Sequence, residues 1–316
     1  MTRATARPTE ASAQTTDTPD ALVATGLGHR HRRGWALRDC SFRLPRGRIC
    51  ALVGPKGAGK STLLSLAAGM LPPSEGTVTV LGHPSGASGA RRRVGYLGQD
   101  RPLYPQFTVE ETLRVGRERN GTWDQALAER LVAEGAVPLS ARIRALSDDQ
   151  RTRIALALAL GRRPDLLLLD EPMSGLGPSG RREMTRILRQ QAAERGMTVL
   201  MSSRMIAHLE GACDHLVLLS HGNIRLAGET DRILAAHHRL LGDASQASLL
   251  PHPAIIAGRE HLGRLSAIVR LDEPLSGRWT TTRLPLAELL LAYLGAPAAP
   301  PMITEGARIE AGGLRS

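Results

Sequence analysis

A glycine-rich segment at residues 54–61 constrains the fold of this chain more than any other part of its sequence. Its residues are Gly54, Pro55, Lys56, Gly57, Ala58, Gly59, Lys60 and Ser61. The apolar segment Arg48–Val53 before it is typical of a short buried strand, and Ser61–Gly69 after it is typical of a helix. Such a loop turns its backbone N–H groups inward and, with the positive end of the helix, holds an anion. The segment therefore predicts a phosphate-binding loop, and this interpretation is favoured over a strand–turn–helix junction with a chance lysine.

Two side chains at the end of this loop are suited to a nucleoside triphosphate. Lys60 is expected to reach the β- and γ-phosphates, and Ser61 to be a ligand of Mg²⁺. We include Thr62, the next residue of the helix, among the expected nucleotide-binding residues. Lys56 and Lys60 are the only lysines in the chain, so the sequence places its whole lysine content in this loop.

A second segment, Leu166–Glu171, supplies carboxylates after an apolar run. Four leucines predict a buried strand that carries Asp170 to a metal, and Glu171, one residue further, is positioned to polarise an attacking water. By itself, an apolar run that ends in Asp-Glu is explained equally well as a strand ending at the surface. Together with the glycine loop, it indicates a site that binds and hydrolyses a nucleotide.

Strand patterns alternate with helix patterns along residues 21–240. The expected strands are Ala21–Leu27, Ala36–Leu44, Arg48–Val53, Thr77–Leu81, Arg93–Leu97, Leu166–Leu169, Thr198–Ser202 and His215–Ser220. The expected helices are Ser61–Gly69, Val109–Arg119, Trp123–Glu134, Asp148–Gly161 and Arg181–Arg195. This order predicts an α/β fold, a P-loop NTPase with a mainly parallel sheet covered on both faces and a helical subdomain inserted at about residues 100–162.

The pattern weakens towards both ends of the chain. We expect a small α+β appendage over residues 245–296, with strands Ala267–Leu271 and Trp279–Leu284 and a closing helix Leu286–Leu294. Residues 1–20 are rich in Thr, Ala and Pro, and residues 297–316 in Ala, Pro and Gly. Both segments are therefore expected to be disordered.

Composition and the search for targeting signals limit the cellular compartment and the kinds of partner that this chain is expected to have. The three cysteines, Cys40, Cys50 and Cys213, have neither disulfide-framework nor metal-ligand spacing, which indicates buried thiols in a reducing compartment. We find no secretory signal and no apolar stretch long enough to span a membrane, so work at a membrane would need a partner. The net charge of +11 comes from residues spread along the chain without an aromatic-interleaved stripe. This distribution favours an anionic membrane surface over nucleic acid as the attracted partner.

Four further segments give the chain a recognisable order. Gln99 follows the expected strand Arg93–Leu97, and Leu146–Gln150 begins two residues before the expected helix Asp148–Gly161 and includes its start. Ser174–Gly177 follows the strand Leu166–Leu169, and Ser202–Arg204 begins at the last residue of the strand Thr198–Ser202. In this order and spacing, residues 21–240 resemble the ATP-binding subunit of an ABC transporter. The resemblance places Gln99 at the Q-loop, as a Mg²⁺ contact and permease sensor. It places Ser147 in the signature, Gly177 in the D-loop and Arg204 at the switch histidine.

The resemblance also implies partners. ATP-binding subunits of this family pair head to tail as homodimers or heterodimers, each signature facing the ATP of the other, beneath an integral-membrane permease. The chain would then lie at the cytoplasmic face of the membrane as a peripheral protein. Its C-terminal appendage resembles the extension of exporter subunits, which favours an exporter over an importer.

Three departures from the family pattern bear on hydrolysis. Asp148 and Asp149 stand where the signature has two glycines, Gly177 stands where the D-loop has aspartate, and Arg204 replaces histidine. Acids in the first turn stabilise the helix itself. Towards a phosphate 4 Å away, each charge would contribute about 4 kcal/mol of repulsion at an effective dielectric of 20. Arg204 can donate to phosphate but is too cationic to shuttle a proton. We therefore expect slow turnover, while Glu171 argues that hydrolysis persists.

Two positions near the nucleotide remain open. Lys56 replaces the usual asparagine and is either a solvated charge or, in a homodimer, a partner in trans for Asp148 or Asp149. For adenine stacking, alignment selects His31, and Trp35 is the better platform. The basic run at residues 29–33 is explained equally well as a solvated loop.

Two alternatives to an exporter motor follow from these departures and from the fold. One is a hydrolysis-impaired regulatory or structural subunit that uses ATP as a clamp. The other is a soluble ABC-type protein of translation or DNA repair, which the sequence disfavours because such proteins carry two nucleotide-binding domains or a long coiled coil.

Overall fold

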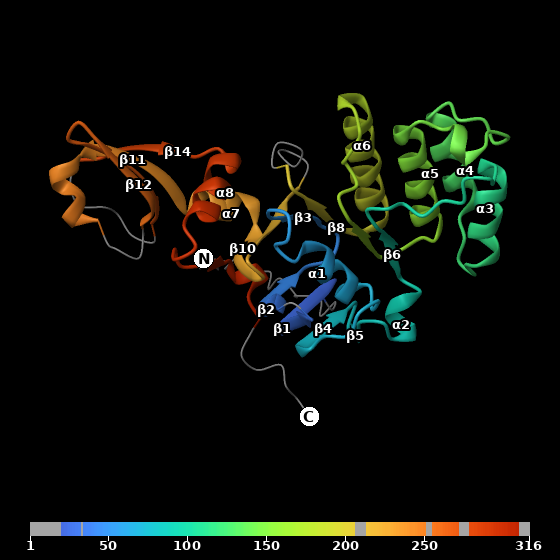
Figure 1. Cartoon of the computed structure of the whole chain (residues 1–316), viewed down its shortest axis with the longest axis horizontal. Helices are drawn as coiled ribbons and strands as arrows, with labels where there is room; N and C mark the ends of the chain where they lie inside the picture. Colours follow the sequence, from blue (N-terminus) through green and yellow to red (C-terminus); the bar gives the residue numbers. More distant parts are fainter. Residues whose placement is uncertain (1–19, 33, 206–212, 251–254, 272–277, 310–316) are drawn as a thin grey trace, which may run out of the picture.

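The computed structural model describes residues 20–32, 34–205, 213–250, 255–271 and 278–309. In Figure 1 the sheet that carries the glycine loop lies in the middle of the molecule, with a helical block at one end of the long axis and a C-terminal appendage at the other. The predicted fold class is confirmed, because the central sheet is mainly parallel and carries the glycine loop at a strand–helix junction.

The central sheet has seven strands in the order β15-β10-β9-β3-β8-β7-β6 within the described residues. Their bounds are β3 Ile49–Val53, β6 Val94–Leu97, β7 Leu166–Leu169, β8 Thr198–Ser203, β9 His215–Ser220, β10 Asn223–Glu229 and β15 Met302–Ile303. All neighbouring pairs from β9 to β6 are parallel, whereas β9 and β10 are antiparallel. Every residue of β3, β7, β8 and β9 is buried, since helices or the second sheet cover both faces.

A second, antiparallel sheet covers one face of the central sheet, in the order β2-β1-β4-β5. Its strands are β1 Leu22–His31, β2 Gly34–Leu44, β4 Glu75–Val80 and β5 His83–Pro84. Helix α1 (Lys60–Ala67) shares one hydrophobic cluster with both sheets, in which Leu63 packs with Phe42 of β2 and Leu52 of β3. The glycine loop is therefore fixed by a core that lies directly behind it.

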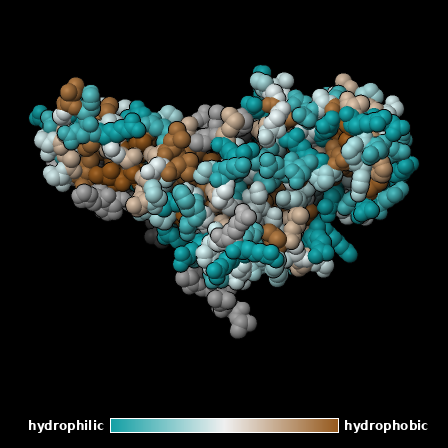
Figure 2. Space-filling view, viewed as in Figure 1, coloured by the Kyte–Doolittle hydropathy of each residue, from teal (hydrophilic) through white to brown (hydrophobic). Residues whose placement is uncertain are grey.

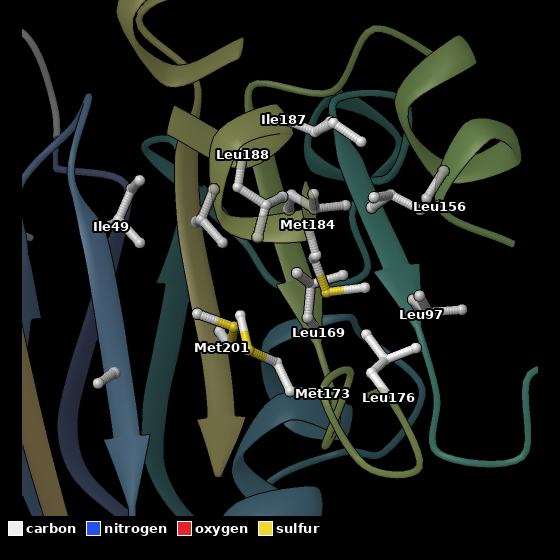
Figure 3. Packing of buried hydrophobic residues seen from close by; sticks show 14 of the residues in the cluster. Ile49, Leu97, Leu156, Leu169, Met173, Leu176, Met184, Ile187, Leu188 and Met201 are labelled. Atoms are coloured by element: carbon white, nitrogen blue, oxygen red, sulfur yellow. The ribbon is translucent and has the colours of Figure 1, made fainter. Parts of the chain in front are cut away.

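The other face of the central sheet is covered by α6 (Pro178–Arg195) and the inserted helical block. Figure 3 shows Met184 and Leu188 of α6 beside Leu169 and Met201 of the sheet. The block contains α3 Val109–Glu118, α4 Gln125–Glu134 and α5 Asp148–Gly161, and short helices α2 Ser88–Arg91 and α7 Thr230–Ala235 lie elsewhere in the chain. Capping boxes begin α3 and α5, because Thr108 and Ser147 each exchange hydrogen bonds with the residue three positions on.

The C-terminal appendage is an antiparallel sheet in the order β12-β13-β11-β14, with α8 (Leu286–Gly295) after it. Its strands are β11 His237–Asp243, β12 Ile255–His261, β13 Arg264–Arg270 and β14 Thr280–Arg283. The appendage sheet thus begins before the expected boundary at residue 245, and β11 and β12 were not predicted because their apolar residues alternate weakly. Figure 2 shows hydrophobic residues on the surface of the appendage, where Leu262 and Leu291 are 89% and 62% exposed.

The expected disorder of residues 297–316 is wrong for residues 297–309. Met302 and Ile303 of β15 pair in parallel with Leu226 and Ala227 of β10, and Ala307 is buried. The composition suggested disorder, but strand β10 supplies hydrogen-bond partners that are distant in the sequence. Residues 1–19 and 310–316 lie outside the described residues. Within the described residues, none of the helices has the length and apolar character that a membrane crossing requires.

Candidate functional site

The glycine loop connects β3 to α1 in a backbone conformation that requires its glycines. Gly57 and Gly59 have φ angles of 83° and 106°, which side chains other than glycine rarely adopt. A Cβ atom on Gly59 would lie 2.4 Å from the carbonyl oxygen of Ala36, and one on Gly54 would lie 2.2 Å from that of Leu219. The loop is therefore held tightly against β2 and β9 behind it, and its outer side is left to an anion.

Lys60 is buried at the start of α1, with 6% of its side chain exposed. Its Nζ donates hydrogen bonds to the carbonyl oxygens of Gly54 (2.8 Å) and Pro55 (3.1 Å), and lies 3.5 Å from Glu171 Oε1. Burial lowers the pKa of Lys60, while the Glu171 carboxylate acts in the opposite direction and favours the charged form. The ammonium group is thus satisfied by the loop and by one carboxylate.

Strands β3, β8 and β7 are neighbours in the sheet, so their carboxyl ends bring the glycine loop, Ser202–Arg204 and Asp170–Glu171 to one edge. The Asp170 N–H donates to Leu97 O of β6 at 2.8 Å. The Ser202 hydroxyl donates to Asp170 Oδ1 at 2.7 Å and accepts from the Glu171 N–H at 2.8 Å. Asp170 and Glu171 are 4% and 9% exposed, so both residues are largely desolvated at this edge of the sheet.

Glu171 has a φ angle of 50°, in the left-handed region. For a residue with a side chain this conformation costs about 1–2 kcal/mol, so its neighbours must hold it there. Arg204 contributes, because its backbone N–H donates to Glu171 Oε2 at 3.2 Å and its Nε lies 3.1 Å from Oε1. The Glu171 carboxylate therefore lies between two cations, Lys60 and Arg204. The sequence placed Arg204 near the phosphate but gave no sign of this pairing.

The other residues expected in the loop and the first turn of α1 differ in exposure. Pro55, Lys56, Gly57 and Ser61 are exposed, Thr62 is half-buried, and Gly54, Ala58 and Gly59 are buried. Among the described residues, no group of three or more His, Cys, Asp or Glu side chains is arranged to hold a metal ion. The donors suit Mg²⁺ bound through one carboxylate, one hydroxyl and the phosphates, because Mg²⁺ seldom uses an all-protein cage. In the described part of the chain only Ser202 donates to the Asp170 carboxylate, so Oδ2 is available for such an ion.

The remaining predicted residues lie around this edge. Gln99 is exposed two residues after β6. Ser147 is exposed and caps α5, where its hydroxyl accepts from the Gln150 N–H at 3.2 Å. His31 is exposed at the end of β1, edge-on to His29 with ring centroids 4.8 Å apart. Trp35 is 39% exposed on β2, across the hairpin, and the Arg30 guanidinium lies 5.9 Å from its ring centroid. The basic run is thus largely the tip of a hairpin, with Arg33 outside the described residues.

The two acids at the signature position, Asp148 and Asp149 (the signature acids), have partners within the same chain. Asp148 Oδ1 lies 3.5 Å from Arg151 Nη1, one turn along α5. Asp149 lies over the backbone of α6, since a Cβ atom on Gly180 would be 2.8 Å from its Oδ2. Arg101 donates to Ser174 O at 2.6 Å; burial lowers its pKa, and Asp148 and Asp149 favour its charged form. Sequence reasoning missed this role of Arg101, because nothing in its spacing marks it.

The chain is similar in sequence to proteins of one known family. The sequence model described as "ABC transporter" matches residues 37–174. A protein of Nostoc sp. named an uncharacterized ABC transporter ATP-binding protein is 33% identical over 241 residues, which cover 71% of each chain. The chain belongs to the family of ABC transporter ATP-binding proteins.

Relatives within this family are named for both directions of transport. The Nod factor export ATP-binding protein I of Bradyrhizobium diazoefficiens is 37% identical, over 64% of this chain and 68% of that protein. The thiamine import ATP-binding protein of Shigella sonnei is 36% identical, over 66% of this chain and 90% of that protein. A solved ATP-binding subunit of an ABC transporter superimposes with a TM-score of 0.62 at 28% identity, covering 68% of this chain and 92% of that chain. As a member of the family, the chain is an ATP-binding subunit of an ABC transporter, and the family hydrolyses ATP.

Proposed function

We propose that this chain is the motor subunit of an exporter and that it hydrolyses ATP slowly. It pairs with a second ATP-binding subunit beneath a separate permease, at the cytoplasmic face of the membrane. The Nod factor export relative and the C-terminal appendage support export. The thiamine import relative has nearly the same sequence identity to this chain, so the argument for export depends chiefly on the appendage.

In this proposal each residue of the site has a task towards ATP. The loop N–H groups and Lys60 bind the phosphates, Ser61, Asp170 and Gln99 hold Mg²⁺, and Thr62, Ser147 and His31 or Trp35 complete the nucleotide site. Bound Mg²⁺ neutralises phosphate charge that develops during transfer. Glu171 polarises the attacking water, which requires its carboxylate to face that water.

The observation that carries slow turnover is the position of the Glu171 carboxylate between Lys60 and Arg204, at 3.5 and 3.1 Å. To act on water, Glu171 must give up its contact with the Arg204 guanidinium, whose Nε lies 3.1 Å from Oε1. The signature acids add repulsion at the facing site of a dimer, although Arg151 and Arg101 offset part of their charge within the chain.

The second candidate function is a nucleotide clamp, a regulatory subunit that binds ATP without turning it over. The same engaged Glu171 supports it, because a carboxylate that never leaves Arg204 cannot activate water. Single-turnover hydrolysis by the purified chain, compared with Glu171→Gln, separates the two candidates. We expect a slow wild-type rate that Glu171→Gln abolishes. Equal rates in the two proteins would contradict the motor and support the clamp.

The membrane partner is tested by co-purification. The chain would be co-expressed with each multi-span membrane protein that a neighbouring gene encodes, and purified in detergent. Co-purification and an ATPase rate that rises in the complex would support a motor beneath a permease. A chain that never joins a membrane protein, yet binds ATP, would contradict it.

A further inference from the structure

The buried hydroxyl group of Ser202 forms hydrogen bonds to both carboxylate residues of the site, Asp170 and Glu171. Ser202 belongs neither to the glycine loop nor to the signature segment. Ser202, in β8, is 1% exposed. Its Oγ donates to Asp170 Oδ1 at 2.7 Å and accepts from the backbone N–H of Glu171 at 2.8 Å. A hydroxyl has one hydrogen to donate, so the bond to Asp170 fixes its rotation and turns a lone pair towards Glu171.

Both ends of this bridge matter to the chemistry. At one end, the bond to Oδ1 restricts rotation of the Asp170 carboxyl group and leaves Oδ2 to point away from Ser202. At the other end, the bond holds the backbone of Glu171, whose φ angle of 50° is otherwise unfavourable. Side chains that hold a metal-binding carboxylate in this way govern metal affinity as well as geometry.

We propose that Ser202 is a positioning residue that couples the Mg²⁺-side carboxylate of Asp170 to the water-activating Glu171. A shift of the Asp170 carboxyl group on metal binding is transmitted through the Ser202 hydroxyl to the Glu171 N–H, in addition to the peptide bond that joins the two residues. This inference rests on the proposed assignment of Asp170 to Mg²⁺, and it does not require the chain to turn over quickly.

The neighbouring residue provides a matched control. Ser203 is also in β8 and is 4% exposed. Its hydroxyl bonds only to the O and N of Met205, each at 3.0 Å, within the described residues. Ser203→Ala therefore removes the same hydroxyl group from the same strand, with the loss of two hydrogen bonds, without touching Asp170 or Glu171.

The experiment measures nucleotide binding, not turnover. A fluorescent trinitrophenyl ATP is titrated into the full chain with EDTA, and Mg²⁺ is then titrated to find the concentration that gives half the metal-dependent change. For Ser202→Ala we expect an unchanged metal-free affinity and a Mg²⁺ midpoint raised about tenfold, the lower end for a lost partner of a metal ligand. Ser202→Thr, which keeps the hydroxyl, should restore the midpoint, and Ser203→Ala should leave it at the wild-type value.

Three results would overturn the proposal. The first is a wild-type midpoint in Ser202→Ala, and the second is an equal shift in Ser203→Ala, which would indicate general loosening of β8. The third is an unshifted midpoint in Asp170→Asn, which would also refute the assignment of Asp170 to Mg²⁺. A shift in Asp170→Asn without one in Ser202→Ala refutes the role of Ser202 alone, and leaves the proposed function standing.

Discussion

Replacing Arg204 by histidine tests whether the ion pair with Glu171 restrains catalysis. The pair joins Arg204 Nε to Glu171 Oε1 at 3.1 Å, with side chains 41% and 10% exposed. At that separation and an effective dielectric of 20, the Coulomb attraction is about 5 kcal/mol. Solvent around Arg204 screens most of it. A hydrogen bond to a charged group contributes a net 1.5–3 kcal/mol, and we take about 1.5 for this half-exposed partner.

If Glu171 must leave Arg204 to activate water, the free energy of this hydrogen bond adds to the activation free energy of hydrolysis. Arg204→His should then raise the single-turnover rate about tenfold, since 1.4 kcal/mol corresponds to a factor of ten. Histidine keeps a donor for phosphate without a permanent charge. The assay is release of labelled phosphate from ATP with enzyme in excess.

Two companion variants make this prediction specific. Arg204→Lys keeps the charge and should stay near the wild-type rate. Glu171→Gln in the Arg204→His background should abolish the gain, because the gain depends on a freed carboxylate. A rate in Arg204→His that is unchanged or lower would refute the restraint and indicate that Arg204 serves the phosphate instead.

Three further predictions concern the loop, a thiol and the dimer. Gly59→Ala should lower the free energy of unfolding in urea by at least about 2 kcal/mol, since its φ is 106° and its Cβ would meet a backbone oxygen at 2.4 Å. Gly57→Ala, with a φ of 83° and no atom within 4 Å, should cost less, and equal losses would contradict the steric argument. Cys213 is half-buried, and desolvation raises its pKa to about 12 from 9.0, so native protein at pH 8 should react with iodoacetamide more slowly than a free thiol. Above pH 9 the thiol ionises in the unfolded chain and not in the folded one, so the free energy of unfolding should fall as pH rises from 9 towards 12. Native labelling at the rate of a free thiol would refute the raised pKa. A double-mutant cycle should show coupling between Lys56 and Asp148 in ATP-driven dimerisation, and additive effects would exclude the pairing in trans.

Several elements could be predicted because their causes are local. Strands β7 and β9 and helix α5 have the predicted bounds, since runs of apolar residues and the Ser147 cap mark them without reference to the rest of the chain. The loop at residues 54–61 was the clearest of these signals, because its glycines are needed by its own backbone.

The residue types and their spacing are enough to predict the phosphate loop, the carboxylates at the end of β7 and the alternation that builds a parallel sheet. The contacts between side chains at that edge of the sheet depend on the tertiary fold. The pairing of Arg204 with Glu171 and the Ser202 bridge join residues more than thirty positions apart. Strand β15 likewise forms only because β10, far earlier in the chain, offers it a partner. A polar contact depends on the separation and direction of two groups in space, and the residue types at the two positions determine neither of these quantities.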